Sequence, residues 1–314
     1  MSEPIQRTVT DRRVERWRAK RSFGPHDLPS AAETARAIAA SGVSIGVALP
    51  ALNEAPTVGA ICRSIRFELM ERTGLVAELV VMDGGSTDGT ESFALDAGAR
   101  VVAAADVLPT VTPVGGKGDS MWRSLEVLET DIVCWIDADI RNFEPHFVSR
   151  LVAPLIADAS IDFVKATYRR PLAVGDLMTA DGGGRVTELC ARPLLRSFFP
   201  ELAGIRQPLA GEYAGRREVL MKVPFFSGYS VEAGLLIDLL DEVGLDAIAQ
   251  ADLGERIHRN RPLAELAPMA NSIARSIIRR ATEWGRAAAT ADELQTSEIE
   301  RPPMANLIAA EAAV

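Results

Sequence analysis

The chain has 314 residues, of which 47% are hydrophobic and 25% are charged, and its formal net charge is -9. This length supports one large domain or two small ones, each with an apolar core. The negative charge argues against nonspecific nucleic-acid binding, and the sequence has no apolar run long enough to cross a bilayer.

Cysteine usage and the N-terminal residues indicate the compartment. Cys62, Cys134 and Cys190 lie far apart, and two of them stand in apolar segments. We expect free thiols in a reducing environment. The basic residues between 12 and 21 are not followed by the apolar core of a signal peptide. Together these features predict a cytosolic protein.

The first half of the chain alternates strands with helices after a polar arm that contains a helix at 30–40. Strands are expected at 43–52, 75–83, 100–105 and 131–136. Helices are expected at 55–72, 86–99 and 116–129. This alternation predicts an α/β protein with a mostly parallel sheet covered by helices on both faces.

The second half is less regular. Helices are expected at 145–156, 188–198 and 231–244, and strands at 162–169 and 245–253. A glycine-rich loop at 181–188 and a turn within 207–220 interrupt them, and the last fifty residues have helical patterns. We predict an N-terminal arm (1–40), one sheet domain (41–262) and a helical C-terminal extension (263–314).

Acidic residues stand at three of the predicted strand ends: Glu54 in "PALNEA", Asp83 in "MDGGSTDGT", and Asp137 with Asp139 in "DADI". Ligands of open parallel sheets bind at the C-terminal ends of the strands. Side chains at i and i+2 of an extended segment point to one side, so these paired carboxylates would repel. A divalent cation relieves the repulsion, although helix caps or solvated acids would also explain a bare D-x-D pattern.

Two glycine-rich segments also suit a nucleotide. Asp83, at a strand tip, can accept a hydrogen bond from a ribose hydroxyl or a base N–H, while a turn followed by a helix cap is the alternative. Lys117, between glycines at a predicted helix start, is a plausible phosphate contact. The segment does not match the Walker loop, and no strand end carries G-x-G-x-x-G.

The order of "PALNEA", "DGGSTDGT", "GGKG" and "DADI" resembles the nucleotide-sugar glycosyltransferases of the GT-A fold over residues 45–140. This resemblance implies a Rossmann-like sheet flanked by helices. It implies that the nucleotide sugar is bound by Pro50, Ala51, Leu52, Glu54, Asp83, Gly84, Ser86, Lys117, Asp137 and Ala138. Asp139 would ligate Mg²⁺ or Mn²⁺ at the diphosphate.

In the second half, "DGGGRVTEL", "QPLAGEY" and "YSVEAGLLID" resemble a retaining branch of this family that uses UDP-glucose and 3-phosphoglycerate. The resemblance implies that His258 completes the metal site with Asp139. It assigns the acceptor to Gly184, Arg185, Val186, Thr187, Tyr229 and Asn260, and the catalytic centre to Asp139, Lys117, Glu232 and Leu209. The C-terminal helices are expected to pair in a homodimer.

Each of these residues also has a plainer interpretation. Arg185 is compatible with a solvated side chain on a mobile loop, and Glu232 with an acid favoured by a helix N-terminus. Pro208 and Gly211 are typical of a tight turn, and a lone histidine such as His258 is more often structural. The set of motifs, rather than any one of them, favours the enzyme.

Three other functions remain open from the sequence. An inverting glycosyltransferase would share the first half but needs an acid as general base, and often a membrane tail. A sugar-phosphate nucleotidyltransferase would carry an early loop rich in glycine and arginine, which "PALNEA" lacks. A nucleotide-sugar-binding scaffold without catalysis is the third. The residues alone do not determine the nucleotide base of the donor, the choice between Mg²⁺ and Mn²⁺, or the identity of a catalytic base.

Overall fold

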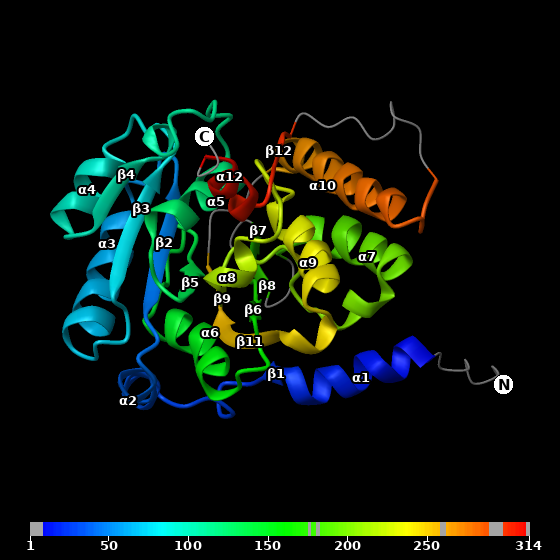
Figure 1. The fold of residues 1–314 in the computed structure, drawn as a ribbon, viewed down its shortest axis with the longest axis horizontal. Helices are drawn as coiled ribbons and strands as arrows, with labels where there is room; N and C mark the ends of the chain where they lie inside the picture. The colour runs from blue at the N-terminus through cyan, green and yellow to red at the C-terminus, as the bar shows by residue number, and fades with distance from the viewer. Residues whose placement is uncertain (1–8, 175–176, 180–182, 258–261, 289–297, 312–314) are drawn as a thin grey trace.

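The computed structural model describes residues 9–174, 177–179, 183–257, 262–288 and 298–311. A central sheet carries helices on both faces (Figure 1). From one edge to the other its eight strands are β1 (Ser22–Phe23), β11 (Ile248–Glu255), β6 (Phe163–Arg169), β9 (Tyr213–Arg216), β5 (Ile132–Trp135), β2 (Ile45–Ala51), β3 (Glu78–Asp83) and β4 (Arg100–Ala103). β9 runs antiparallel to both of its neighbours, and the other pairs are parallel. The predicted α/β class with a mostly parallel sheet is confirmed.

The two faces of the sheet have separate apolar cores because successive side chains of a strand point to opposite sides. Val47 and Leu49 face one core, whereas Ala48, between them, faces the other. The first face is covered by α2 (Ala31–Ser41), α3 (Val58–Ser64), the π-helix η1 (Ile65–Glu71), α4 (Thr90–Asp96) and α6 (His146–Ala157).

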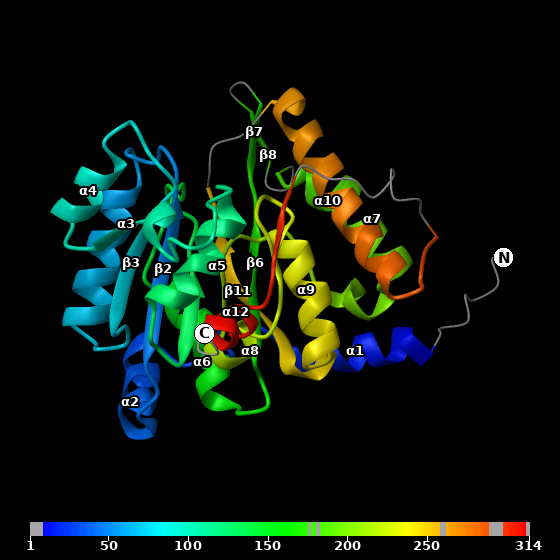
Figure 2. The ribbon, with the colours of Figure 1, turned by 45° about the horizontal axis from the view of Figure 1, so that its top comes forward.

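The second face is covered by helices from both ends of the chain. These are α1 (Val9–Arg21), α5 (Lys117–Val127), α7 (Arg192–Phe198), α9 (Val231–Glu242), α10 (Leu263–Glu283) and α12 (Met304–Glu311). Figure 2 shows α10 running across α7 and α9 on this side. The remaining elements are short: η2 (Ala104–Asp106), β7 (Leu172–Val174), β8 (Leu177–Thr179), η3 (Thr187–Ala191), η4 (Pro200–Gly204), α8 (Arg217–Leu220), β10 (Phe225–Phe226), η5 (Leu245–Ala247) and β12 (Glu300–Arg301).

Three expectations about local structure need correction. The helix expected at 55–72 is α3 followed by the π-helix η1. The helix expected at 86–99 begins only at Thr90, because Gly89 has φ +88° and Asp83 organises the turn before it. The turn expected within 207–220 is present, since Ala210 N donates to Gln207 O at 3.0 Å, but the same segment also contains the central strand β9. That strand was not expected, because four residues are too few to show a strand pattern.

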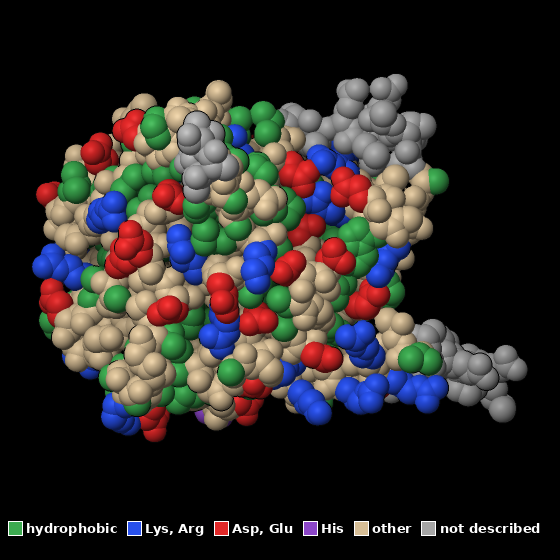
Figure 3. Space-filling view, in the orientation of Figure 1, with side chains coloured by type: hydrophobic (Ala, Val, Ile, Leu, Met, Phe, Trp, Pro, Cys, Tyr) green, Lys and Arg blue, Asp and Glu red, His purple; other side chains and the backbone are tan. Residues whose placement is uncertain are grey.

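The N-terminal arm is integrated in the fold. α1 buries Trp17, whose indole Nε1 donates to Ile248 O at 2.7 Å, and β1 extends the sheet beside β11. Val14 and Trp17 are the buried residues of an otherwise polar helix, so its sequence resembled a free arm. The basic side chains of α1 form a blue run at the lower right of the surface in Figure 3. The division at residues 40 and 262 stays a prediction.

Two further expectations can be compared with the structure. Cys62, Cys134 and Cys190 are free thiols, and the first two are fully buried. Among the helices described, none combines the length and apolar character needed to cross a bilayer.

Candidate active site

A cavity of about 470 Å³ opens where β2, β5 and β6 end, between the sheet and the helices α9 and α10. Most residues assigned to substrates from the sequence line it together. They are Pro50, Ala51, Leu52, Glu54, Gly84, Lys117, Asp137, Ala138, Asp139, Gly184, Arg185, Val186, Thr187, Leu209, Tyr229 and Glu232. Segments from residue 50 to residue 232 therefore share one concave surface, as expected for ligands at the strand ends.

The acidic pair follows β5 directly, and one guanidinium bridges it. Arg256 Nη2 donates to Asp137 Oδ2 at 2.7 Å and to Asp139 Oδ1 at 2.9 Å. This contact relieves the repulsion that the i, i+2 spacing creates. Arg256 also donates from Nε to Glu212 Oε1 at 2.6 Å, and both of these side chains are buried. Neither Arg256 nor Glu212 was predicted from the sequence, although Arg256 stands two residues before His258.

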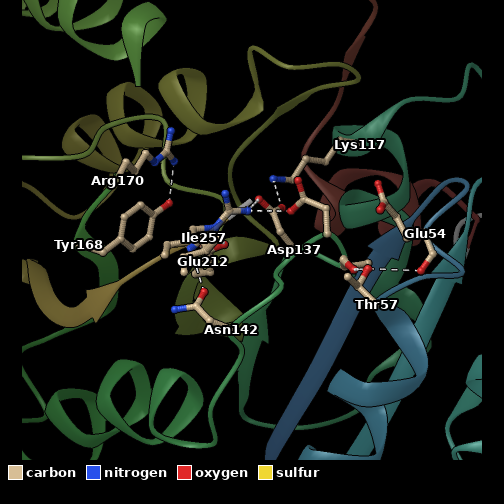
Figure 4. A network of polar contacts seen from close by, with 12 residues as sticks. Glu54, Thr57, Lys117, Asp137, Asn142, Tyr168, Arg170, Glu212 and Ile257 are labelled. Carbon is tan, nitrogen blue, oxygen red and sulfur yellow. Dashed lines mark hydrogen bonds and ion pairs between the residues drawn. The ribbon is translucent and has the colours of Figure 1, made fainter. Parts of the chain in front are cut away.

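Lys117 faces the same acids from the other side. It is the first residue of α5, and its ammonium forms an ion pair with Asp137 (Figure 4). A second ion pair joins the ammonium to Glu232 Oε1 at 2.7 Å. Burial alone would lower the pKa of Lys117, but the two carboxylates outweigh it and raise that pKa well above its usual value. Lys117 is therefore a fixed positive charge at the wall of the cavity.

Asp137 stays ionised for the same reason. Burial would raise the pKa of Asp137, but the charges of Lys117 and Arg256 outweigh burial and hold that pKa well below its usual range. Gly211 permits this arrangement, because a Cβ at Gly211 would come within 2.0 Å of Asp137 Oδ2. Gly211 was expected only to form a turn. Thr57 Oγ1 donates to Ala138 O at 2.5 Å, which fixes the loop between the two acids.

The rim formed by β2 and β3 matches the predicted nucleotide side, with two exceptions. Asp83 and Ser86 do not line the cavity. The Asp83 carboxylate accepts from the backbone N–H groups of Gly85 and Ser86, and Ser86 Oγ accepts from Asn53 N at 2.9 Å. Asn53 has φ +59° and lines the cavity. The turn interpretation of this segment therefore describes the structure, and a nucleotide role for Asp83 stays a prediction.

The opposite end of the cavity is formed by the glycine loop and by the end of β6. Arg170 lines it beside Arg185, and the Arg170 guanidinium donates to Tyr168 OH at 2.7 Å. Within the described part of the chain, buried Arg170 Nε and Thr187 Oγ1 have no hydrogen-bond partner. Unsatisfied buried groups at a cavity wall indicate a polar ligand. Arg170 was missed from the sequence because nothing local distinguishes it from a surface arginine.

Two predicted residues, His258 and Asn260, lie outside the described residues, so the expected metal ligand and acceptor contact stay predictions. Across the described ranges, no group of three His, Cys, Asp or Glu side chains marks a metal site. The donor set nevertheless fits a hard cation. Asp139 lines the cavity and keeps 30% of its side chain exposed. One carboxylate completed by phosphate oxygens is a common arrangement for Mg²⁺.

Comparison with known proteins identifies the family to which this chain belongs. The family described as "Glycosyl transferase family 2" matches residues 46–211, more than half of the chain. Glucosyl-3-phosphoglycerate synthase of Mycolicibacterium smegmatis is 51% identical over 242 residues, which cover 77% of this chain and 79% of that protein. The chain belongs to glycosyl transferase family 2, in the group of the glucosyl-3-phosphoglycerate synthases. It is therefore a glycosyltransferase.

Similar solved structures extend the likeness over nearly the whole chain. Glucosyl-3-phosphoglycerate synthase from Mycobacterium tuberculosis, in complex with Mn²⁺, UDP-glucose and phosphoglyceric acid, has a TM-score of 0.78 and 43% identity, covering 91% of this chain and 98% of that one. Mannosyl-3-phosphoglycerate synthase from Rubrobacter xylanophilus has a TM-score of 0.83 and 39% identity, covering 94% and 98%. The GT-A fold implied by the sequence motifs is confirmed.

Proposed function

We propose that this enzyme transfers glucose from UDP-glucose to the 2-hydroxyl of 3-phosphoglycerate, with retention of the α-anomer and with the help of Mg²⁺ or Mn²⁺. The observation that carries the proposal is a single cavity with two kinds of wall. One wall holds Lys117 with its partners Asp137 and Glu232, and the other holds Arg170 and Arg185 beside a glycine loop. The relative from Mycobacterium tuberculosis, a glucosyl-3-phosphoglycerate synthase like that of Mycolicibacterium smegmatis, was solved in complex with UDP-glucose and phosphoglyceric acid.

The donor is assigned to the wall formed by β2, β5 and α5. Residues 50–54 and 84 would contact the uridine, and Asp137 with Ala138 the ribose and diphosphate. Asp139 and His258 would hold the cation, which would supply neutralising charge at the diphosphate. Lys117 adds a second positive charge there, which stabilises the negative charge that develops on the leaving UDP. Leu209 and Glu232 would face the glucose.

The acceptor is assigned to the opposite wall. 3-Phosphoglycerate carries a carboxylate and a phosphate, and guanidinium groups bind both kinds of anion through charge-assisted hydrogen bonds. Arg185 and Arg170, with Thr187 and the loop amides around Gly184, provide such donors. Tyr229 and Asn260 complete the predicted set. Arg170 is our addition, supported by its unsatisfied buried Nε.

We assign retention of the α-configuration to attack by the acceptor hydroxyl on the same face of the anomeric carbon from which UDP departs. Glu232, the carboxylate expected to face the sugar, is ion-paired with Lys117 at 2.7 Å. A carboxylate held in this way is a poor nucleophile and a poor base. The acceptor hydroxyl would therefore bond to the anomeric carbon while the glycosidic C–O bond to UDP breaks. The hydroxyl proton would pass to the departing phosphate oxygen.

The acceptor assignment is tested by comparing 3-phosphoglycerate with glycerate, which lacks the phosphate. A site built to bind the phosphate discriminates strongly against an analogue that lacks it, because the buried donors for the phosphate would be left unpaired. We expect a kcat/KM for 3-phosphoglycerate at least about 100-fold higher, the ratio for a lost charged hydrogen bond of about 3 kcal/mol. Equal values would contradict the assignment. The matching mannose nucleotide belongs in the same assay, given the likeness to a mannosyl synthase.

We also propose a cytosolic homodimer. The free buried thiols Cys62 and Cys134 support a reducing compartment. Leu189 on η3 and Leu263 on α10 are 79% and 68% exposed, which supports pairing through the C-terminal helices. Light scattering of the purified chain tests the dimer, and a monomeric mass at micromolar concentration would rule it out.

A further inference from the structure

A C-terminal segment, residues 298–304, runs behind the candidate active site, and we name it the C-terminal strap. Its strand β12, labelled in Figure 1, pairs antiparallel with β10. Ser227 N donates to Ile299 O at 2.8 Å, and Ile299 N donates to Ser227 Oγ at 3.1 Å. Met304, where α12 begins, is fully buried. The strap is therefore a packed part of the fold next to the segment that leads into α9.

Glu298, at the start of the strap, binds the turn in front of α9. Its Oε2 accepts from the backbone N–H groups of Gly228 at 3.1 Å and Ser230 at 3.2 Å. Its Oε1 accepts from the hydroxyls of Ser230 at 3.1 Å and Ser272 at 2.6 Å. Ser230 is the N-cap residue of α9, yet its own side chain makes no capping hydrogen bond. A carboxylate from a distant segment thus organises this helix start, where negative charge is favourable.

The turn held by Glu298 carries cavity residues. Tyr229 lies within it and Glu232 lies two residues beyond Ser230, and both line the cavity. Glu232 reaches Lys117 at 2.7 Å, so the position of its carboxylate depends on where α9 begins. A Cβ at Gly228 would meet the Glu298 carboxylate at 2.6 Å. Only glycine therefore lets the strap approach the turn this closely.

The other end of the strap fixes α5, the helix that carries Lys117. Arg301 Nε donates to Asp119 Oδ1 at 2.6 Å, and Arg301 Nη2 donates to Thr112 O at 2.6 Å. Asp119 N in turn donates to Ser227 O at 2.9 Å. The strap thus contacts both structural elements that bring Lys117 and Glu232 together.

We propose that Glu298 is a positioning residue of the sugar subsite. By fixing the turn 228–230, it holds Tyr229 and Glu232 in place opposite Lys117. The sugar donor in this statement rests on the proposed function, whereas the ordering of the turn does not. Glu298 does not line the cavity, so it acts through these neighbours rather than on the substrate.

The test compares Glu298→Ala and Glu298→Gln with Glu283→Ala as a matched control. Glu283 also lies in the C-terminal part and forms ion pairs with Arg279 and Arg280, but it does not line the cavity. In Glu298→Ala we expect unchanged UDP affinity by calorimetry and a kcat reduced roughly 10- to 100-fold, the effect of a small misplacement in an active site. Glu298→Gln should recover part of kcat, because the two serine hydroxyls can turn to accept from its amide.

Hydrogen exchange in the protein without ligands gives a second readout that needs no donor. Amides at 228–232 should exchange faster in Glu298→Ala and at the wild-type rate in Glu283→Ala. Equal loss of UDP and UDP-glucose affinity, an equal kcat loss in the control, or unchanged exchange at 228–232 would each overturn the positioning role. Failure of the wild type to use UDP-glucose would refute the proposed function, and the exchange measurement would still decide the role of Glu298.

Discussion

Lys165 is a buried cation that the proposed chemistry does not use. It lies in β6 with no exposed surface, and within the described residues its ammonium has no hydrogen-bond partner. The ammonium lies 3.9 Å from the centre of the Tyr213 ring. Such a cation–π contact contributes about 0.5–2 kcal/mol, whereas burial of an unpaired charge costs several kcal/mol. Desolvation therefore dominates.

The pKa of Lys165 follows from this balance. Burial, together with the charge of Lys117, lowers the pKa of Lys165 to about 7. The carboxylates of Glu232, Glu212 and Asp137 act in the opposite direction without restoring it. The native protein consequently favours the neutral amine above pH 7, while an unfolded lysine keeps its proton up to about pH 10.

Replacing Lys165 with methionine tests this reasoning through the pH dependence of stability. Above pH 7 the unfolded wild-type chain binds a proton that the native state does not, so the free energy of unfolding rises with pH. Lys165→Met lacks this contribution. The free energy of unfolding of the wild type minus that of the variant should therefore be constant below pH 7. Above pH 7 this difference should rise by about 1.4 kcal/mol per pH unit, or by about 2–3 kcal/mol at pH 9.

Urea unfolding of both proteins between about pH 6 and pH 9, followed by tryptophan fluorescence, measures this difference. Contributions of other groups largely cancel in the subtraction, because both proteins share them. A difference that does not change with pH across the range would refute the reasoning. It would mean that Lys165 keeps its charge in the native protein, with a partner that compensates for burial.

Other substitutions probe the donor and acceptor walls. Asp139→Ala, and EDTA treatment of the wild type, should abolish turnover; full activity after chelation would exclude a metal role. Lys117→Ala should lower kcat by about 100- to 1,000-fold if its charge stabilises the leaving UDP, and an unchanged single-turnover rate would count against this. Asp83→Ala should weaken UDP binding by about 1–3 kcal/mol in calorimetry if its carboxylate reaches the nucleotide. Unchanged UDP affinity would show that Asp83 only stabilises the turn. Arg170→Ala should raise KM for 3-phosphoglycerate by about 10- to 100-fold, the effect of a lost charged hydrogen bond, while KM for UDP-glucose stays constant. Equal changes in the two KM values would contradict a role of Arg170 in acceptor binding.

Local sequence patterns were sufficient to predict most strands of the sheet and the residues at the strand ends. β2, β3 and β5 are continuous apolar runs that stop at polar residues, so the positions of Glu54 and Asp137 follow from chain order alone. Lys117 was predicted because two glycines precede a helical pattern. In these cases the residues that determine the structure are neighbours in the sequence.

Contacts between distant segments escaped prediction. Arg256 contacts Asp137, which is 119 residues away in sequence, and Glu212, which is 44 residues away. No periodic pattern in the sequence predicts such a pairing. β9 was missed because a four-residue strand is defined by the strands on either side of it. Trp17 showed no sign of burial, since its helix is polar except where it contacts the sheet. The roles of Arg256, Glu212 and Glu298 therefore had to come from the structure.

The central claim is retaining glucosyl transfer to 3-phosphoglycerate, and NMR of the product tests it most directly. The enzyme is incubated with UDP-glucose, Mn²⁺ and 3-phosphoglycerate, and the product is examined for its anomeric configuration and its linkage. We predict glucose in α-linkage at the 2-hydroxyl, with one UDP released for each product formed. A β-linked product, or UDP release without any glucosylated 3-phosphoglycerate, would contradict the account.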